Sequence, residues 1–287
     1  FLVCVPGLEA ALASEARALG FDSVEVTRGG VSYKGDWKDV WRANLWLRGA
    51  TRVLVRIGQF RAKNLGALER SAAAFPWSTH LSPREPLRLD VTCRKSRISH
   101  TGAVEARLER AQRGAVIPVT ASAAVALKVR IENDVVTLSL DTSGEPLYKR
   151  GHKVAVGKAP LRESMAALIL GQAGFMPGMT VVDPTCGSGT IPLEAADIAS
   201  GRAAGRDRSF AFERLPSINR ATYATLPRTG NAVPQAAFGF DRDDGAIKNA
   251  RANATRAQLD VTFNRKTLSE LDAPSGSDTG LLICNPP

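Results

Sequence analysis

The sequence is poor in the residues that bind metals or form disulfides, with four cysteines and three histidines in 287 residues. The four cysteines are far apart and form no CxxC pair, and no histidine is close enough to complete a zinc site; they are Cys4, Cys93, Cys186 and Cys284. We therefore expect no metal centre and a reducing, cytoplasmic compartment.

Long apolar runs are also missing. No stretch reaches the roughly 20 residues that a transmembrane helix needs, and the first ten residues, FLVCVPGLEA, lack the basic segment and cleavage site of a signal peptide. We therefore expect no membrane partner.

Acidic residues are in deficit. The chain has 38 Lys and Arg against 28 Asp and Glu, a formal charge of +10 and a pI near 9.8. The basic residues are spread through sequence with folded character and are not confined to a tail, which favours a polyanionic partner. A basic enzyme without such a partner is the alternative that charge alone leaves open.

Residues 1–60 alternate short apolar strands with amphipathic helices. Apolar residues recur at helical spacing from Leu8 to Leu19, and Gly20 follows, where a helix end favours a residue that tolerates positive φ. Arg28-Gly29-Gly30 indicates a hairpin turn, and Asp36 is a good N-cap for a second helix. A strand over 52–57 completes the order β-α-β-β-α-β, which is the ferredoxin-like arrangement.

Residues 61–150 predict a second α+β module. We expect two helices and three strands, the last two strands being joined by a hairpin turn at Asn133-Asp134; the helices span 64–74 and 102–113, and the strands 87–93, 125–131 and 135–140.

The densest basic loop of this half follows the first of these strands. Its candidate RNA contacts are Arg94, Lys95, Arg97 and His100. Cations beside a helix N-terminus can contact phosphates or simply be solvated, and both interpretations stay open. Lys149 and Arg150, in the linker 147–152, are two further candidate contacts.

Beyond the linker the pattern becomes strand, glycine loop, helix, repeated, which predicts a parallel sheet. We place its strands at 180–182, 237–240, 261–264 and 281–284. The Arg-rich stretch from about 200 to 234 has few periodic apolar residues and is interpreted as an insertion.

The clearest motif is an apolar strand that ends in an acid and runs through a glycine loop into a helix. Glycines let the backbone approach a ligand, and the free amides at the helix start can face an anionic group. The spacing matches neither a phosphate loop nor G-x-G-x-x-G, and a purely structural glycine turn is the alternative. The candidate cofactor residues are Asp183, Pro184, Thr185, Cys186, Gly187, Ser188 and Gly189.

Two later strand ends add candidates. Asp241, followed by Arg242, is placed to accept hydrogen bonds from ribose hydroxyls, and Asp243 is expected to cap the next helix. Asn285-Pro286-Pro287 ends the last strand, where Asn285 would point into the cofactor crevice. Its side-chain oxygen and the Pro286 carbonyl could hold both N–H bonds of an exocyclic amine, which would make that nitrogen nucleophilic. A simple Asn-Pro turn is the alternative.

With Asn285-Pro286-Pro287, the segment Asp183 to Thr190 resembles the amino-methyltransferase class of Rossmann-like S-adenosylmethionine enzymes. Four further motifs resemble the THUMP-containing guanine-N2 RNA methyltransferases, most of all the bacterial enzymes that act on large-subunit (23S) ribosomal RNA; they are Pro6-Gly7-Leu8-Glu9, Arg28-Gly29-Gly30-Val31, Leu147-Tyr148-Lys149-Arg150-Gly151 and Ala159-Pro160-Leu161-Arg162-Glu163. The likeness covers essentially the whole chain.

This resemblance implies a ferredoxin-like subdomain over 1–60, a THUMP RNA-binding domain over 61–150 and a Rossmann-like methyltransferase domain over 151–287. It implies that Asp183 and the glycine loop hold the methionine end of S-adenosylmethionine, that Asp241 holds the ribose, and that guanine N2 attacks the methyl group directly. Cys186 and Cys284 are then small packing residues.

The sequence departs from the family pattern in three ways. Thr267 stands where the family usually has an acid near the adenine amino group. The aromatic residue that follows Pro287 in the family, and would stack the flipped base, is absent because the sequence stops. The later strands are absent too, so we expect an α/β sheet truncated after its fourth strand.

Other functions share these motifs. DNA adenine-N6 and protein glutamine methyltransferases also use Asn-Pro-Pro, but the N-terminal half favours a platform that reads RNA shape. A transfer RNA guanine-N2 methyltransferase would share both modules. A non-catalytic RNA-binding or ribosome-assembly factor with a degenerate methyltransferase domain is the alternative outside enzymes, and the intact loop and Asn285 speak against it.

Overall fold

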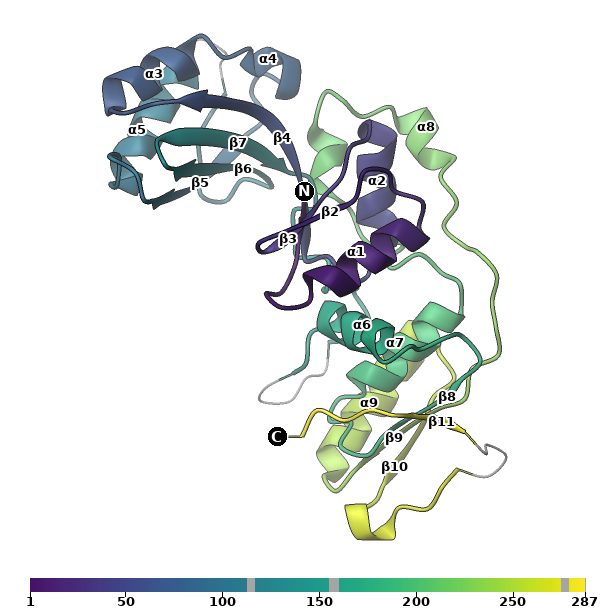
Figure 1. Cartoon of the computed structure of the whole chain (residues 1–287). Helices are drawn as coiled ribbons and strands as arrows, with labels where there is room; N and C mark the ends of the chain where they lie inside the picture. Colours follow the sequence, from purple (N-terminus) through teal and green to yellow (C-terminus); the bar gives the residue numbers. More distant parts are fainter. Residues whose placement is uncertain (113–116, 155–159, 275–278, 287) are drawn as a thin grey trace.

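The computed structural model describes residues 1–112, 117–154, 160–274 and 279–286. An N-terminal body holding β1 to β7 stands above a C-terminal body holding α6, α7, α9 and β8 to β11 (Figure 1). In the part of the chain described, no helix is both long and apolar enough to cross a membrane.

The first six elements follow the predicted β-α-β-β-α-β order; they are β1 (Leu2–Val3), α1 (Glu9–Ala18), β2 (Glu25–Thr27), β3 (Gly30–Ser32), α2 (Trp37–Trp46) and β4 (Arg52–Arg61). Local signals placed them correctly. Gly20 follows α1 with φ +72°, Gly29 occupies the β2–β3 turn with φ +82°, and Asp36 caps α2 in a capping box with Asp39. Their antiparallel order, β2-β3-β1-β4, is that of the ferredoxin-like fold.

The second group of elements joins the same sheet; it contains α3 (Leu65–Ala73), α4 (Trp77–His80), β5 (Leu87–Arg94), α5 (Thr101–Gln112), β6 (Val125–Glu132) and β7 (Val135–Asp141). β4 runs four residues beyond its expected end at Ile57 and pairs with β7 along its length, with a bulge between Arg56 and Gly58. Strands from both sides of the predicted 60/61 boundary therefore form one seven-stranded sheet, β2-β3-β1-β4-β7-β6-β5.

The C-terminal body is a parallel sheet of four strands in the order β10-β9-β8-β11. Its elements are α6 (Glu163–Gln172), β8 (Thr180–Asp183), α7 (Thr190–Ala199), β9 (Ala237–Asp241), α9 (Asp244–Ala257), β10 (Thr262–Arg265), η3 (Leu268–Glu270) and β11 (Gly280–Leu282). The predicted strands are confirmed to within one residue at most ends, although β11 stops two residues early. Because all four strands are parallel, their carboxyl ends meet at one edge.

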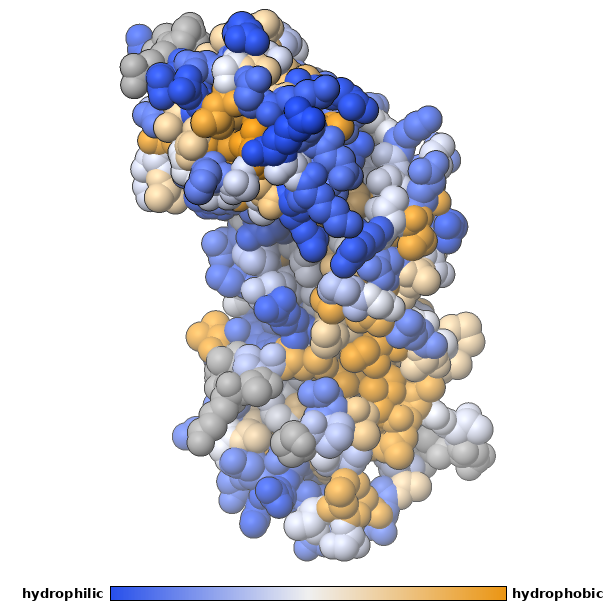
Figure 2. Space-filling view, turned by 60° about the vertical axis from the view of Figure 1, so that its left-hand side comes forward, coloured by the Kyte–Doolittle hydropathy of each residue, from blue (hydrophilic) through white to orange (hydrophobic). Residues whose placement is uncertain are grey.

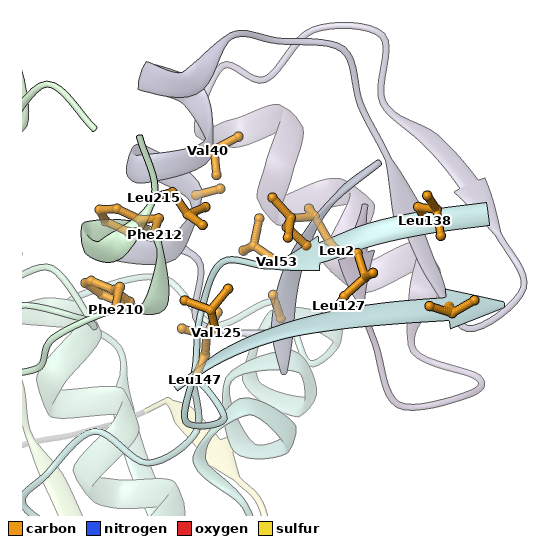
Figure 3. Packing of buried hydrophobic residues seen from close by; sticks show 14 of the residues in the cluster. Leu2, Val40, Val53, Val125, Leu127, Leu138, Leu147, Phe210, Phe212 and Leu215 are labelled. Carbon is orange, nitrogen blue, oxygen red and sulfur yellow. The ribbon is translucent and has the colours of Figure 1, made fainter. Parts of the chain in front are cut away.

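The predicted insertion, 200–234, returns to the N-terminal body and covers it with η2 (Ala211–Arg214) and α8 (Arg220–Ala224) (Figure 1). Phe210, Phe212 and Leu215 pack into the same apolar cluster as Val40 and Leu147 (Figure 3). This segment thus adds aromatic side chains to a core whose other members lie earlier in the sequence, from Leu2 to Leu147 among the N-terminal elements.

A buried ionic cluster joins the two bodies. Arg48, just after α2, donates to Glu194 at 3.0 Å and to Asp197 at 2.8 Å, both on α7. Arg150 donates to Glu194 at 2.8 Å and to the Arg48 carbonyl at 3.1 Å, and Arg206 pairs with Asp197 at 2.9 Å. The predicted RNA contact of Arg150 is therefore wrong, because its side chain is only 1% exposed and is committed to this cluster.

Candidate cofactor and amine-methylation site

The glycine loop lies at the carboxyl end of β8, where the predicted strand-loop-helix motif is confirmed. Gly189 is the N-cap of α7, so the free amides at the helix start face the loop. Asp183 is buried, and its carboxylate accepts a hydrogen bond from the Thr185 amide at 3.0 Å. The Cys186 amide donates to the Phe240 carbonyl at 2.8 Å, which ties the loop to the neighbouring strand.

Glycine is needed at Gly187 and at Gly189 for different physical reasons. Both adopt positive φ, +54° at Gly187 and +85° at Gly189, a conformation that strains other residues. A Cβ at Gly187 would meet no protein atom within 4 Å, whereas a Cβ at Gly189 would lie 2.7 Å from the ring of Phe263. Gly189 is therefore required by packing, while Gly187 borders open space that a ligand can enter.

Asp241 ends β9 and shapes the same loop. One carboxylate oxygen accepts a hydrogen bond from the Gly187 amide at 3.0 Å, and the other accepts a hydrogen bond from the Asp243 amide at 3.0 Å. Each oxygen keeps a further lone pair, so hydrogen bonds from ribose hydroxyls stay possible. Asp243 caps α9 as predicted, accepting from the amides of Gly245 and Ala246.

The charge balance of this edge fits a cationic cofactor. Neither Asp183 nor Asp241 forms an ion pair with any residue that the structure describes. Burial, with a smaller contribution from the charge of Asp241, raises the pKa of Asp183 to about 7. S-adenosylmethionine carries a positively charged ammonium and sulfonium, so the unpaired carboxylates and the space beside Gly187 match it.

Asn285 and Pro286 follow β11, which pairs with β8 so that Leu282 lies opposite Val182. The Ile283 amide donates a hydrogen bond to the Val182 carbonyl at 2.9 Å, which places Ile283 beside Asp183. Asn285 follows two residues later. Asn285 and Pro286 are exposed, and Pro287 lies outside the described residues. Cys186 is buried as expected, but Cys284 is exposed, so its predicted packing role is wrong.

Thr267 and Arg242 are the more peripheral candidates. Thr267 caps η3, and both its amide and its hydroxyl donate to the Glu270 carboxylate at 2.8 Å. The Lys266 amide donates to the Asp241 carbonyl, which keeps this turn next to the ribose candidate. Arg242 is exposed. Their contacts with the cofactor stay predictions.

Two residues of the site, Phe263 and Asn253, were missed by sequence reasoning. Phe263 fills the space left by Gly189 and also by Gly239, whose Cβ would lie 2.5 Å from its ring. Asn253 on α9 donates to the Ser188 carbonyl at 3.1 Å and is fully buried. The available signal was its position on the apolar face of α9, which is otherwise formed by Ile247 and alanines.

The candidate RNA loop is exposed and held by local hydrogen bonds. The Arg97 amide donates to the Asp134 carboxylate at 2.9 Å, and the Asp134 amide donates to the Ser96 hydroxyl at 3.1 Å. Arg94, Lys95 and His100 are exposed as well. Lys149 is exposed and pairs with Glu145. In the described chain, no group of His, Cys, Asp and Glu side chains could hold a metal ion.

Comparison with known proteins supports the ferredoxin-like start of the N-terminal body and the methyltransferase fold of the C-terminal body. Residues 1–54 match the RlmL ferredoxin-like domain, and residues 150–287 match the RMKL-like methyltransferase domain. The protein named "Putative RNA methyltransferase slr0064", from Synechocystis sp., is 31% identical across the whole chain, which covers 78% of that relative. The chain belongs to the RMKL-like RNA methyltransferase family.

Longer RMKL-like relatives exist. The "Ribosomal RNA large subunit methyltransferase K/L" of Syntrophotalea carbinolica is 35% identical over the whole chain, and the chain spans 44% of its length. Two crystal structures superpose over the full chain. SMU.472 complexed with S-adenosylhomocysteine has a TM-score of 0.87 at 29% identity, and the chain covers 79% of it. A "predicted N6-adenine-specific DNA methylase" of Listeria monocytogenes has a TM-score of 0.86 at 30% identity, with 78% covered.

These findings establish the cofactor of the RMKL-like fold. S-adenosylmethionine is the methyl donor, because the chain has this methyltransferase fold and its structural relative SMU.472 carries the demethylated product of that donor.

Proposed function

We propose that this chain methylates the exocyclic N2 amine of a guanosine in 23S ribosomal RNA, using S-adenosylmethionine. The observation that carries the proposal is the position of Asn285, which follows β11 directly beside the strand that supplies Asp183 and the glycine loop. The amide oxygen and the cofactor loop are thereby brought to one edge of the sheet.

In this reaction the main task of the protein is to orient the target amine toward the methyl donor. The Asn285 side-chain oxygen and the Pro286 carbonyl accept hydrogen bonds from the two N–H groups of the target amine. These hydrogen bonds turn the nitrogen lone pair away from the ring system and toward the methyl donor. S-adenosylmethionine, when bound, supplies an electrophilic methyl group. Neither Asn285 nor Pro286 is committed to a hydrogen bond with a described residue, so both acceptors are available.

Asp183, the glycine loop and Asp241 hold the donor. The α7 amides and Gly187 face its methionine end, the Asp183 carboxylate attracts its positive charge, and Asp241 accepts from the ribose. Thr267 and Arg242 complete the proposed cofactor contacts. The cysteines take no covalent part, because burial raises the pKa of the Cys186 thiol well above its ordinary value.

RNA is proposed as the substrate because an RNA methyltransferase relative is similar over the whole chain and because the N-terminal body is basic. In this proposal, residues 61–150 are a THUMP domain that docks RNA through Arg94, Lys95, Arg97 and His100. Guanine N2 is the target suggested by the motif resemblance. The proposed domain limits remain 1–60, 61–150 and 151–287.

The decisive experiment uses the full chain with S-adenosylmethionine labelled in its methyl group. Deproteinised ribosomal RNA, transfer RNA and double-stranded DNA are offered separately and digested to nucleosides. Asn285→Ala is compared with Asn231→Ala, which removes an exposed asparagine on the connection leading to β9. We expect label in N2-methylguanosine from ribosomal RNA, retained in Asn231→Ala and lost in Asn285→Ala while cofactor binding persists.

Each other outcome has a definite meaning. Label only in transfer RNA moves the substrate and keeps the chemistry. Label in adenine N6 of DNA would favour the activity named for the Listeria relative and refute the RNA proposal. Cofactor binding without transfer to any of these substrates refutes the methylation of guanine, and the absence of cofactor binding favours a binding factor.

A further inference from the structure

The strands β4, β7, β6 and β5 form a half-sheet with two unlike faces. One face is covered by α5, with α3 packed against it, and it carries the apolar side chains of alternate positions, including Leu127, Val129 and Leu138. Because side chains alternate along a strand, the intervening residues share the other face.

Strand register arranges these intervening residues in three rows across the strands. The first row is Arg56, Ser139, Lys128 and Asp90; the second is Gln59, Thr137, Arg130 and Thr92; the third is Arg61, Val135, Glu132 and Arg94. We call these twelve residues the polar sheet face. Two cross-strand bonds verify the rows: Gln59 donates to Thr137 at 3.2 Å, and Lys128 donates to Asp90 at 2.5 Å.

The polar sheet face has an excess of positive charge. It contains five cations, Arg56, Arg61, Arg94, Lys128 and Arg130, against the two acids Asp90 and Glu132. Two of the cations neutralise the two acids, since Lys128 forms an ion pair with Asp90 and Arg130 forms an ion pair with Glu132 at 2.6 Å. The other three are exposed.

Arg56, Arg61 and Arg94 form no ion pair with any described residue. Arg56 and Arg61 lie on β4, and Arg94 ends β5, three strands away. With strands about 4.8 Å apart, these free guanidinium groups are distributed over roughly 15 Å of sheet. Such a spread favours an extended polyanion over a single small anion.

The face carries no aromatic side chain. Phe60, the aromatic residue of β4, lies opposite buried Val136 and so belongs to the covered face. Sheets that bind single-stranded RNA stack its bases on exposed aromatic rings, and none of the twelve residues of the polar sheet face is aromatic. Arginine and hydroxyl side chains instead suit phosphate and 2′-hydroxyl groups, which a base-paired RNA presents on its outside.

The polar sheet face is continuous with the loop proposed above to contact RNA. Arg94 is both the last residue of the third row and the first of that loop, and Lys95 and Arg97 follow it. The hydrogen bond from the Arg97 amide to Asp134 fixes the loop beside the β6–β7 turn, at the same end of the sheet. Hydrophilic side chains cover much of this body in Figure 2.

From these observations we propose that the polar sheet face docks a base-paired segment of the substrate RNA through its sugar-phosphate backbone. The proposal rests on RNA being the substrate and adds where and in what form the RNA is held. In this proposal, recognition depends on the charge and shape of the RNA backbone and is independent of the base sequence.

The test measures binding of the full chain to a fragment of deproteinised ribosomal RNA, to a plain RNA duplex and to a single strand of equal length. The variant replaces Arg56, Arg61 and Arg94 with Gln. Its matched control replaces Lys38, Arg70 and Arg110 with Gln. These three exposed cations on α2, α3 and α5 form no ion pair with any described residue, and their replacement changes the net charge equally.

Each phosphate contact contributes about 0.7–0.9 to the magnitude of the slope of log K against log salt. Because the variant removes three such contacts, the magnitude of its slope should be smaller by about 2 to 3. Extrapolated to about 0.1 M salt, that is a loss of affinity for the duplex on the order of 100-fold. The control should bind like the wild type, and the wild type should bind the duplex more tightly than the single strand.

Equal affinities of variant and control for the duplex would overturn the proposal, as would a preference for single strands that the variant abolishes. Label transfer is measured on the same fragment to separate the two proposals. Transfer by the wild type with unchanged binding by the variant refutes the docking face alone. No transfer, with binding that depends on the three arginines, refutes the methylation proposal alone.

Discussion

Replacing Gly189 with Ala is expected to destabilise the protein much more than the same change at Gly187. Both positions have positive φ, which costs an alanine about 1–2 kcal/mol. At Gly189 the new methyl group would also lie 2.7 Å from the Phe263 ring and 3.1 Å from the Ala250 side chain. Overpacking of this kind adds about 1–3 kcal/mol. We therefore expect a loss of about 1–2 kcal/mol for Gly187→Ala and about 2–5 kcal/mol for Gly189→Ala.

The free energy of unfolding is measured by urea denaturation without cofactor, and cofactor affinity by titration calorimetry. Gly187→Ala should weaken cofactor binding out of proportion to its stability loss, since its methyl group points into open space beside the loop. Phe263→Leu should cost less in the Gly189→Ala background than in the wild type, with a coupling of about 1 kcal/mol or more. Equal unfolding free energies for the two alanine variants, or strictly additive effects with Phe263→Leu, would refute the packing argument.

Three further predictions follow from buried charges. Burial raises the pKa of Asp183 from 3.8 to about 7, so the cofactor-free protein should lose up to about 4 kcal/mol of stability as the pH rises from about 4 to 7. Asp183→Asn should flatten this part of the profile measured by urea unfolding, and an unchanged slope would contradict the assignment. Cofactor binding should favour the ionised Asp183 and release a proton near pH 6, which calorimetry in buffers of different ionisation enthalpy detects; no buffer dependence would count against contact with the positive charge. Burial raises the pKa of Asp197, but the ion pairs with Arg48 and Arg206 outweigh it and hold that pKa at about 2, so this stabilisation of about 2 kcal/mol is complete above pH 4 and is lost as the pH falls to 2. Asp197→Asn should cost about 3–5 kcal/mol at neutral pH, and a loss below 1 kcal/mol would show that the cluster does not join the bodies.

Local patterns in the sequence determined most of the secondary structure and the cofactor loop. Asp36 and Asn64 cap their helices, and Asn133-Asp134 turns between β6 and β7 with φ of +52° and +61°. These signals are reliable because they depend on the hydrogen bonding and φ preferences of a few adjacent residues. The strand-loop-helix containing Asp183 and Gly189 is of the same kind, and it is the signal on which the predicted cofactor site rests.

Only the tertiary structure decided the features that depend on distant partners. β4 continues beyond Ile57 because β7, more than 70 residues later, pairs with it. Arg150 is buried because Glu194 supplies an opposite charge, and the 200–234 segment covers a core whose other members precede it. Burial and strand register are set by residues far apart in sequence, and so periodicity cannot reveal them. For the same reason the polar sheet face, whose unpaired arginines come from β4 and β5, exists only after the sheet has formed.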